Sequence, residues 1–167
     1  MRFVSIIIGS KSDYDVMKEC AKTLEKFGVP YELIISSAHR SPDRTKNYIK
    51  DAEARGAVVF IAAAGMAAHL AGAVAATTIK PVIGVPMSSS DLRGEDALLS
   101  TVMMPAGMPV ATLAIGKAGA INSAYLAMQI LAIDDDELKV KLTEDRLAKA
   151  KKVETDSAEI EVLISKS

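Results

Sequence analysis

The sequence predicts an α/β fold, a three-layer α/β/α sandwich built on five parallel strands. Short apolar runs rich in β-branched residues alternate with longer segments of helical period, which is typical of βα units in a parallel sheet. The runs are apolar at nearly every position instead of alternating with polar residues, so helices should cover both faces of the sheet. The predicted strands are residues 3–8, 31–36, 58–63, 81–85 and 110–115.

Capping residues place the helices between these strands. Ser12 is predicted to cap the first helix, which should end at Gly28 with Pro30 beyond it. Ser41 followed by Pro42 opens the second helix in the same way. Further helices are expected at about 67–78, 96–103 and 118–131. Strands and helices together predict a flavodoxin-like arrangement.

The composition changes after Ile133 and becomes highly charged. Leu138 and Leu142 lie at helical spacing, and acidic residues stand at the start of the segment, where the helix dipole favours them. We expect an additional C-terminal helix, broken near 155–157, that lies on the domain or on a neighbouring subunit.

The length and composition predict one domain and a small, soluble partner. The chain has 167 residues, of which 50% are hydrophobic, enough for one sizeable core. We therefore predict a single domain over 1–167, with an α/β core at 1–133 and a helical extension at 134–167. The net charge of -1 and the aromatic content of 4% give no electrostatic case for binding nucleic acid or an anionic membrane.

The N-terminal and cysteine patterns predict a cytoplasmic protein. Every long apolar stretch is interrupted before the ~20 residues that a membrane span needs. The apolar part of the N-terminus is too short for a signal peptide, and the single cysteine, Cys20, has no partner for an internal disulfide.

The loops that follow the strands are the expected place for a ligand, because ligands of open parallel sheets bind beyond the carboxyl ends of the strands. The first loop reads GSKSD. Ser10, Ser12 and nearby backbone N–H groups could bind a phosphate, and Asp13 could accept hydrogen bonds from ribose hydroxyls. Ordinary helix capping explains the same serines and acid equally well.

The second and third loops contain the two histidines of the chain, His39 and His69. Arg40 beside His39 can hold a phosphate through its fork of donors, and a histidine can move protons near neutral pH. A surface pair on a loop is the plainer interpretation. Because both loops leave neighbouring strand ends in this fold, we expect the histidines and the arginine to meet in one pocket.

The third loop carries almost no side-chain bulk around Ala64 and Gly65. Such residues let a ligand approach the backbone and leave a small apolar hollow, although tight helix-to-sheet packing also uses them. The fourth loop, at 86–95, is either a polar lid or a solvated loop, and the sequence does not separate these alternatives.

Taken in order, these motifs resemble one family. The segments GSKSD, SAHRSPD, AGMAAHLAG, PVIGVP and MPAGMPVATLAIGKAGAINSAYLA are similar to those of the N5-carboxyaminoimidazole ribonucleotide mutases, the catalytic subunit of phosphoribosylaminoimidazole carboxylase, over roughly the first four fifths of the chain. Two positions depart from the family pattern. Met66 stands where a second glycine is common, and Ala71 stands where proline often occurs.

The resemblance implies an isomerase of purine (IMP) biosynthesis that moves a carboxylate from the exocyclic nitrogen to C4 of an aminoimidazole ribonucleotide. It also implies a homo-octamer and no metal, nucleotide or redox cofactor. The implied site has a phosphate and ribose end and a carboxylate end. The first end would be Ser10, Ser12, Asp13 and Arg40, and the second Ser37, His39, Ala64, Gly65, His69 and Leu70.

Three other functions fit the sequence less well. A related branch carboxylates aminoimidazole ribonucleotide directly with CO2, but it tends to have Ala-His-Lys in the second loop and to lack the histidine of the third, so Arg40 and His69 favour the mutase. A flavin binder would need an aromatic residue to sandwich the ring, and the chain has no Trp and only four Tyr. A receiver domain would need an acceptor aspartate where this chain has Ala62 and Ala63.

Overall fold

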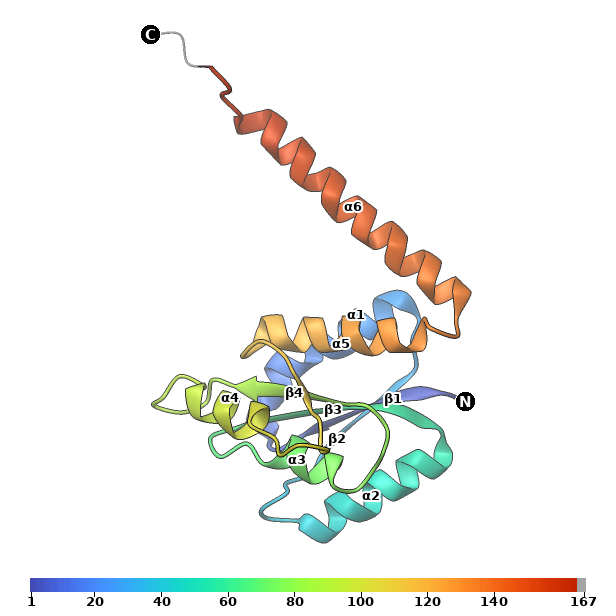
Figure 1. Cartoon of the computed structure of the whole chain (residues 1–167), viewed down its shortest axis with the longest axis vertical. Coiled ribbons are helices and arrows are strands. Elements are labelled where there is room, and N and C mark those ends of the chain that lie inside the picture. The colour runs from blue at the N-terminus through green and yellow to red at the C-terminus, as the bar shows by residue number, and fades with distance from the viewer. Residues whose placement is uncertain (165–167) are drawn as a thin grey trace. The chain divides into compact units, whose positions relative to one another are not determined.

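The computed structural model describes residues 1–164 and divides the chain into two compact units (Figure 1). The first unit is Met1–Ile130, and the second begins at Leu131. Within the described residues, no helix combines the length and the apolar character that a membrane crossing would require.

The first unit is built on a five-stranded parallel sheet with the order β2-β1-β3-β4-β5, which confirms the predicted fold class. β1 and β4 are buried at every position, as their continuous apolar runs predict. The strands are β1 (Phe3–Ile8), β2 (Tyr31–Ile35), β3 (Ala57–Gly65), β4 (Val82–Met87) and β5 (Ala111–Thr112).

β5 is much shorter than the run at 110–115 predicted. Only Ala111 and Thr112 pair with β4, opposite Ile83 and Gly84. After Thr112 the chain turns back toward the sheet edge, and the N–H of Gly116, at a φ of 73°, donates to the carbonyl of Pro86 (2.9 Å). The turn ends the strand although the residues remain apolar.

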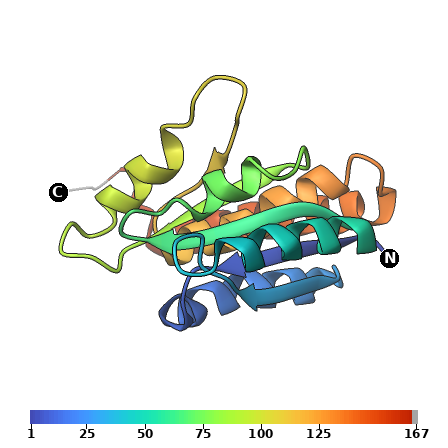
Figure 2. The same ribbon diagram turned by 90° about the horizontal axis from the view of Figure 1, so that it is seen from below.

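Helices cover both faces of the sheet, giving three layers (Figures 1 and 2). α1 (Tyr14–Phe27) and α5 (Lys117–Leu131) lie on one face, and α2 (Pro42–Arg55), α3 (Leu70–Ala75) and α4 (Glu95–Val102) lie on the other. Apolar side chains of α2 and α3 pack on those of β1 and β3 in one buried cluster, which includes Ile7, Ile49, Phe60 and Val74.

The thiol of Cys20, on α1, is fully buried and accepts a hydrogen bond from the hydroxyl of Ser123 on α5 (3.5 Å). Burial raises the pKa of this thiol to about 11, so it stays protonated at neutral pH.

Contrary to the sequence prediction, Ser12 does not cap the first helix. The Ser10 hydroxyl accepts a hydrogen bond from the N–H of Ser12 (3.1 Å) and opens a short 3-10 turn, η1 (Lys11–Asp13), before α1. The predicted cap was therefore wrong by two residues, since the chain inserts a tighter turn first. The predicted end at Gly28 is confirmed, with a left-handed φ of 73°.

α3 is shorter than the predicted helix at 67–78. Met66 has a φ of 57°, which no right-handed helix accepts, and the N–H of His69 donates to the carbonyl of Ala67 (2.9 Å) in a turn. The helix therefore starts only at Leu70, and His69 occupies its N-cap position.

The second unit consists mainly of α6 (Asp136–Ile160), one continuous helix without the break expected near 155–157. The carboxylate of Asp135 accepts from the N–H of Leu138 (2.9 Å) and caps it. Across the expected break, Lys152 pairs with Asp156 (2.8 Å) and the Thr155 hydroxyl donates to the carbonyl of Lys151 (3.0 Å). The Lys152–Asp156 pair at i,i+4 spacing supports the helix here, and the Thr155 hydroxyl is satisfied within the same helix.

Candidate active site

The two histidines meet at the carboxyl edge of the sheet. The Nε2 atom of His39 lies 2.7 Å from the Nδ1 atom of His69, and the rings stand nearly perpendicular at 85° with centroids 4.8 Å apart. One nitrogen must donate and the other accept, so the tautomers of the two rings are coupled. Both side chains are exposed, so a ligand can reach them.

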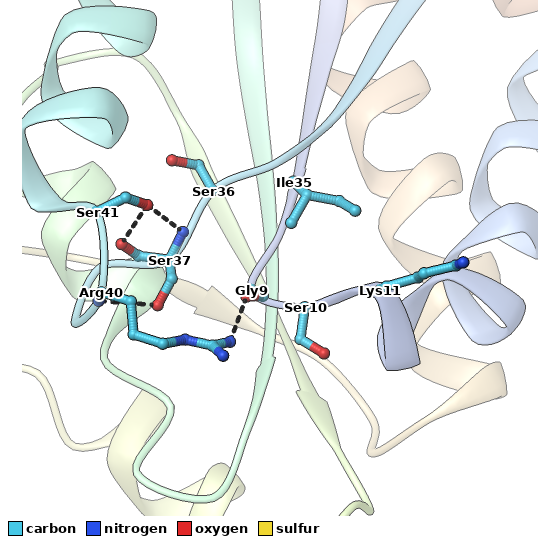
Figure 3. Close-up of a pocket in the computed structure, with 8 residues that line it drawn as sticks. All are labelled: Gly9, Ser10, Lys11, Ile35, Ser36, Ser37, Arg40 and Ser41. Atoms are coloured by element: carbon cyan, nitrogen blue, oxygen red, sulfur yellow. Dashed lines mark hydrogen bonds between the residues drawn. The ribbon is translucent and has the colours of Figure 1, made fainter.

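A pocket of about 530 Å³ opens between the loops after β1 and β2 (Figure 3). Figure 3 shows the Arg40 side chain reaching across toward the first loop, where a guanidinium N–H donates to the carbonyl of Gly9 (3.5 Å). The pocket is lined by Gly9, Ser10, Lys11, Ile35, Ser36, Ser37, Arg40 and Ser41. In Figure 3 the Lys11 side chain points away from Arg40. The Arg40 guanidinium and the hydroxyls of Ser10 and Ser37 make the pocket suited to a small anion such as a phosphate.

Ser37 and Ser41 shape the loop that carries Arg40. The Ser37 hydroxyl accepts from the N–H of Arg40 (3.1 Å), while the Ser41 hydroxyl accepts from the N–H of Ser37 (3.1 Å) and donates to its carbonyl (3.1 Å). These bonds fix the turn that holds His39 and Arg40 side by side.

In the first loop, the two serine hydroxyls contact each other and the acidic residue is buried. The hydroxyls of Ser10 and Ser12 are 2.5 Å apart. Asp13 is only 5% exposed, and burial raises the pKa of its carboxyl group, against hydrogen bonds from Ser10 and Ser12 that lower it. Asp13 lies beside Gly9, within reach of the pocket, but outside its lining.

The small residues of the third loop lie next to the first loop. The N–H of Gly9 donates to the carbonyl of Ala63 (2.9 Å), and a Cβ placed on Gly9 would stand 3.5 Å from that of Ala64. Ala64 and Gly65 are half-buried at the end of β3. Leu70 is 2% exposed and packs in the core, so the structure does not bring it to the exposed surface of the site.

Sequence reasoning missed three residues near these loops. Lys11 lies within the GSKSD motif and lines the pocket, so its charge was a readable signal. Ser41 was assigned only to capping, yet it braces Ser37. Ser89 contacts Gly65 from the fourth loop, and no local pattern announces this contact.

Comparison with known proteins identifies the family. The sequence model of AIR carboxylase matches residues 3–152. The chain belongs to the AIR carboxylase family. It is 53% identical over 158 residues to an N5-carboxyaminoimidazole ribonucleotide mutase of Pyrococcus horikoshii, covering 95% of this chain and 88% of that one. The mutase of Escherichia coli K12 is 50% identical over 150 residues, with coverages of 90% and 89%.

A solved structure has the same fold as this chain. The crystal structure of Treponema denticola PurE superposes with a TM-score of 0.88 at 27% identity, covering 97% of this chain and 100% of that chain.

The two departures from the expected AIR carboxylase pattern have different surroundings. Met66 takes the left-handed φ of 57° that a glycine would adopt freely, and its side chain is 62% exposed beside the site. Ala71, on α3, is 2% exposed and packs in the core. Only the first departure therefore changes the surface that a ligand would meet.

Proposed function

We propose that this chain is an N5-carboxyaminoimidazole ribonucleotide mutase of purine biosynthesis, an isomerase that forms 4-carboxyaminoimidazole ribonucleotide. The observation that carries the proposal is the 2.7 Å contact of His39 with His69 next to the Arg40 pocket. Relatives about half identical to the chain over most of its length carry the mutase name.

The pocket binds the 5′-phosphate of the substrate. Arg40 supplies positive charge, and the hydroxyls of Ser10 and Ser37 supply hydrogen bonds. Asp13, behind Gly9, and Ser12 complete this end by binding the ribose and the phosphate. The imidazole ring then extends from the first two loops toward His39.

The carboxylate moves at the other end of the site. The carbamate C–N bond breaks, CO2 leaves, and the exocyclic nitrogen gains a proton from an imidazole. The C4 carbon attacks CO2 to form the new C–C bond, and the same imidazole removes the C4 proton, so protons balance over the cycle. Ala64 and Gly65 hold CO2 close to C4 and away from bulk water.

His39 is the proton carrier in this scheme and His69 orients it. His39 directly precedes the phosphate-binding Arg40, so its ring is held in register with the substrate, and its contact with Nδ1 of His69 fixes which nitrogen carries the proton. Direct carboxylation of aminoimidazole ribonucleotide is not favoured, because relatives that are 53% identical to this chain are named as mutases.

The test is an assay with two substrates. N5-carboxyaminoimidazole ribonucleotide should be isomerised without ATP or added metal, and aminoimidazole ribonucleotide with bicarbonate should be a far poorer substrate. Preference for the second pair would assign the chain to the carboxylating branch.

We infer that the enzyme is a cytoplasmic homo-octamer that acts on the route to IMP, with the whole chain as one domain. Apolar side chains on and after α4 support self-association, since Leu99, Val102 and Met103 are 60%, 43% and 77% exposed. Light scattering at working concentration should give the mass of eight chains, and a monomeric mass would refute the assembly.

A further inference from the structure

Ser89, two residues beyond β4, presses its hydroxyl against the backbone of Gly65 at the end of β3. A Cβ built on Gly65 would lie 1.8 Å from the Ser89 hydroxyl oxygen and 3.2 Å from the Ser89 Cβ. The hydroxyl thus occupies the space in which any other residue at position 65 would place its side chain. Since Gly65 pairs with Met87, this contact lies at the carboxyl edge of the sheet, between β3 and β4.

The fourth loop is held in place around this contact. The Ser90 hydroxyl donates to the carboxylate of Asp96 (2.8 Å). Gly94, at a φ of 89°, is buried against the carbonyl of Met87, which a Cβ at position 94 would approach to 3.3 Å. The loop is therefore anchored on both sides of Ser89.

The Ser89 hydroxyl itself is available to a ligand. Ser89 is exposed, and among residues 1–164 its hydroxyl makes no hydrogen bond, whereas that of Ser90 is used in the loop. An anchored, unused donor beside Gly65 is the arrangement expected of a ligand contact.

We propose that Ser89 binds the migrating carboxylate of the substrate, an inference that rests on the proposed function. The charged groups Arg40 and Lys11 line the phosphate pocket between the first two loops, so they serve the opposite end of the ligand. The hollow at Ala64 and Gly65 offers apolar surface, and an ionised carboxylate there needs hydrogen-bond donors. The Ser89 hydroxyl is a donor placed at that end, beside Gly65, the last residue of the strand that leads to His69.

The test compares two ribonucleotides that differ by this carboxylate. Isothermal calorimetry would measure binding of 4-carboxyaminoimidazole ribonucleotide and of aminoimidazole ribonucleotide to the wild type and to Ser89→Ala. Loss of a hydrogen bond to a charged group should weaken binding of the carboxylated ligand about 10- to 100-fold. Binding of aminoimidazole ribonucleotide should stay within about 2-fold of wild type. The matched control, Ser88→Ala, removes the neighbouring exposed hydroxyl and should change neither affinity.

A second variant displaces the same Ser89 hydroxyl by a substitution at Gly65. In Gly65→Ala the new methyl group must displace the Ser89 hydroxyl, so the same selective loss is expected, and adding Ser89→Ala to it should cost little more. Equal loss of both ligands in Ser89→Ala, or no loss of either, would overturn the assignment. A wild type that binds neither ribonucleotide would overturn the proposed function itself.

Discussion

The guanidinium of Arg40 bonds the carbonyl of Gly9 at 3.5 Å and thereby bridges the loops that follow β2 and β1. The bond is long and exposed, so a phosphate oxygen can replace the carbonyl as acceptor at little cost. The bridge holds the cation over the pocket before any ligand arrives, which reduces the ordering required on binding.

Arg40→Ala should weaken substrate binding without stopping the chemistry. A hydrogen bond to a charged group contributes about 1.5–3 kcal/mol, so KM and the dissociation constant should rise about 10- to 100-fold while kcat changes less. Arg44→Ala is the matched control, because Arg44 follows on α2 and donates to the carbonyl of Ile35 (3.4 Å) outside the pocket lining. Equal effects of the two substitutions would place the phosphate elsewhere.

His39→Asn should abolish turnover and spare binding. Asparagine has a similar size and keeps a hydrogen-bonding amide, but it cannot carry a proton at neutral pH. His69→Asn should slow the reaction less, since His69 acts through its contact with His39. Both proteins would be checked by circular dichroism and particle size, then assayed for isomerisation and for binding by calorimetry. A dead His69→Asn beside an active His39→Asn would exchange the two roles.

Met66→Gly should stabilise the protein. A non-glycine residue in the left-handed region costs about 1 kcal/mol or more, and the Met66 side chain is too exposed to recover it by burial. We expect the free energy of unfolding in urea to rise by about 1 kcal/mol. Met66→Ala keeps the unfavourable φ and should show no such gain, so an equal gain in both variants would point to the side chain instead.

The free energy of unfolding of Asp13→Asn should increase relative to that of the wild type as pH rises. Burial raises the pKa of Asp13 in the folded state above its ordinary value near 3.8, so the folded protein holds the proton more tightly than the unfolded chain. The free energy of unfolding of the wild type should therefore fall as pH rises from below 3.8 through the folded pKa. The amide does not titrate and avoids this loss. Urea titrations of both proteins between pH 3 and pH 7 would measure the difference, and parallel curves would contradict it.

The sequence predicted what depends on strand order and little of what depends on single backbone angles. Apolar runs and the glycine stop at Gly28 predicted the elements, and the topology of a parallel sheet predicted that His39 and His69 meet at the same edge. The start of α3 could not be foreseen, because nothing in a methionine announces a φ of 57°.

Two other features depend on tertiary or competing local contacts. The approach of Ser89 to Gly65 joins loops 24 positions apart, so neither residue signals it alone. The polar residues near Thr155 are typical of a helix break, yet the Lys152–Asp156 pair and the Thr155 hydroxyl keep α6 continuous.

The buried thiol of Cys20 makes this chain convenient for site-specific labelling. Its protonated sulfur, enclosed between α1 and α5, should react slowly with maleimides, and the sequence has no other cysteine to compete with an introduced one. A cysteine placed at the exposed Asp91 would therefore take up a fluorophore or spin label almost alone. Such a probe would report whether the loop around Ser89 shifts when a ribonucleotide binds, and the buried Cys20 would not have to be replaced first.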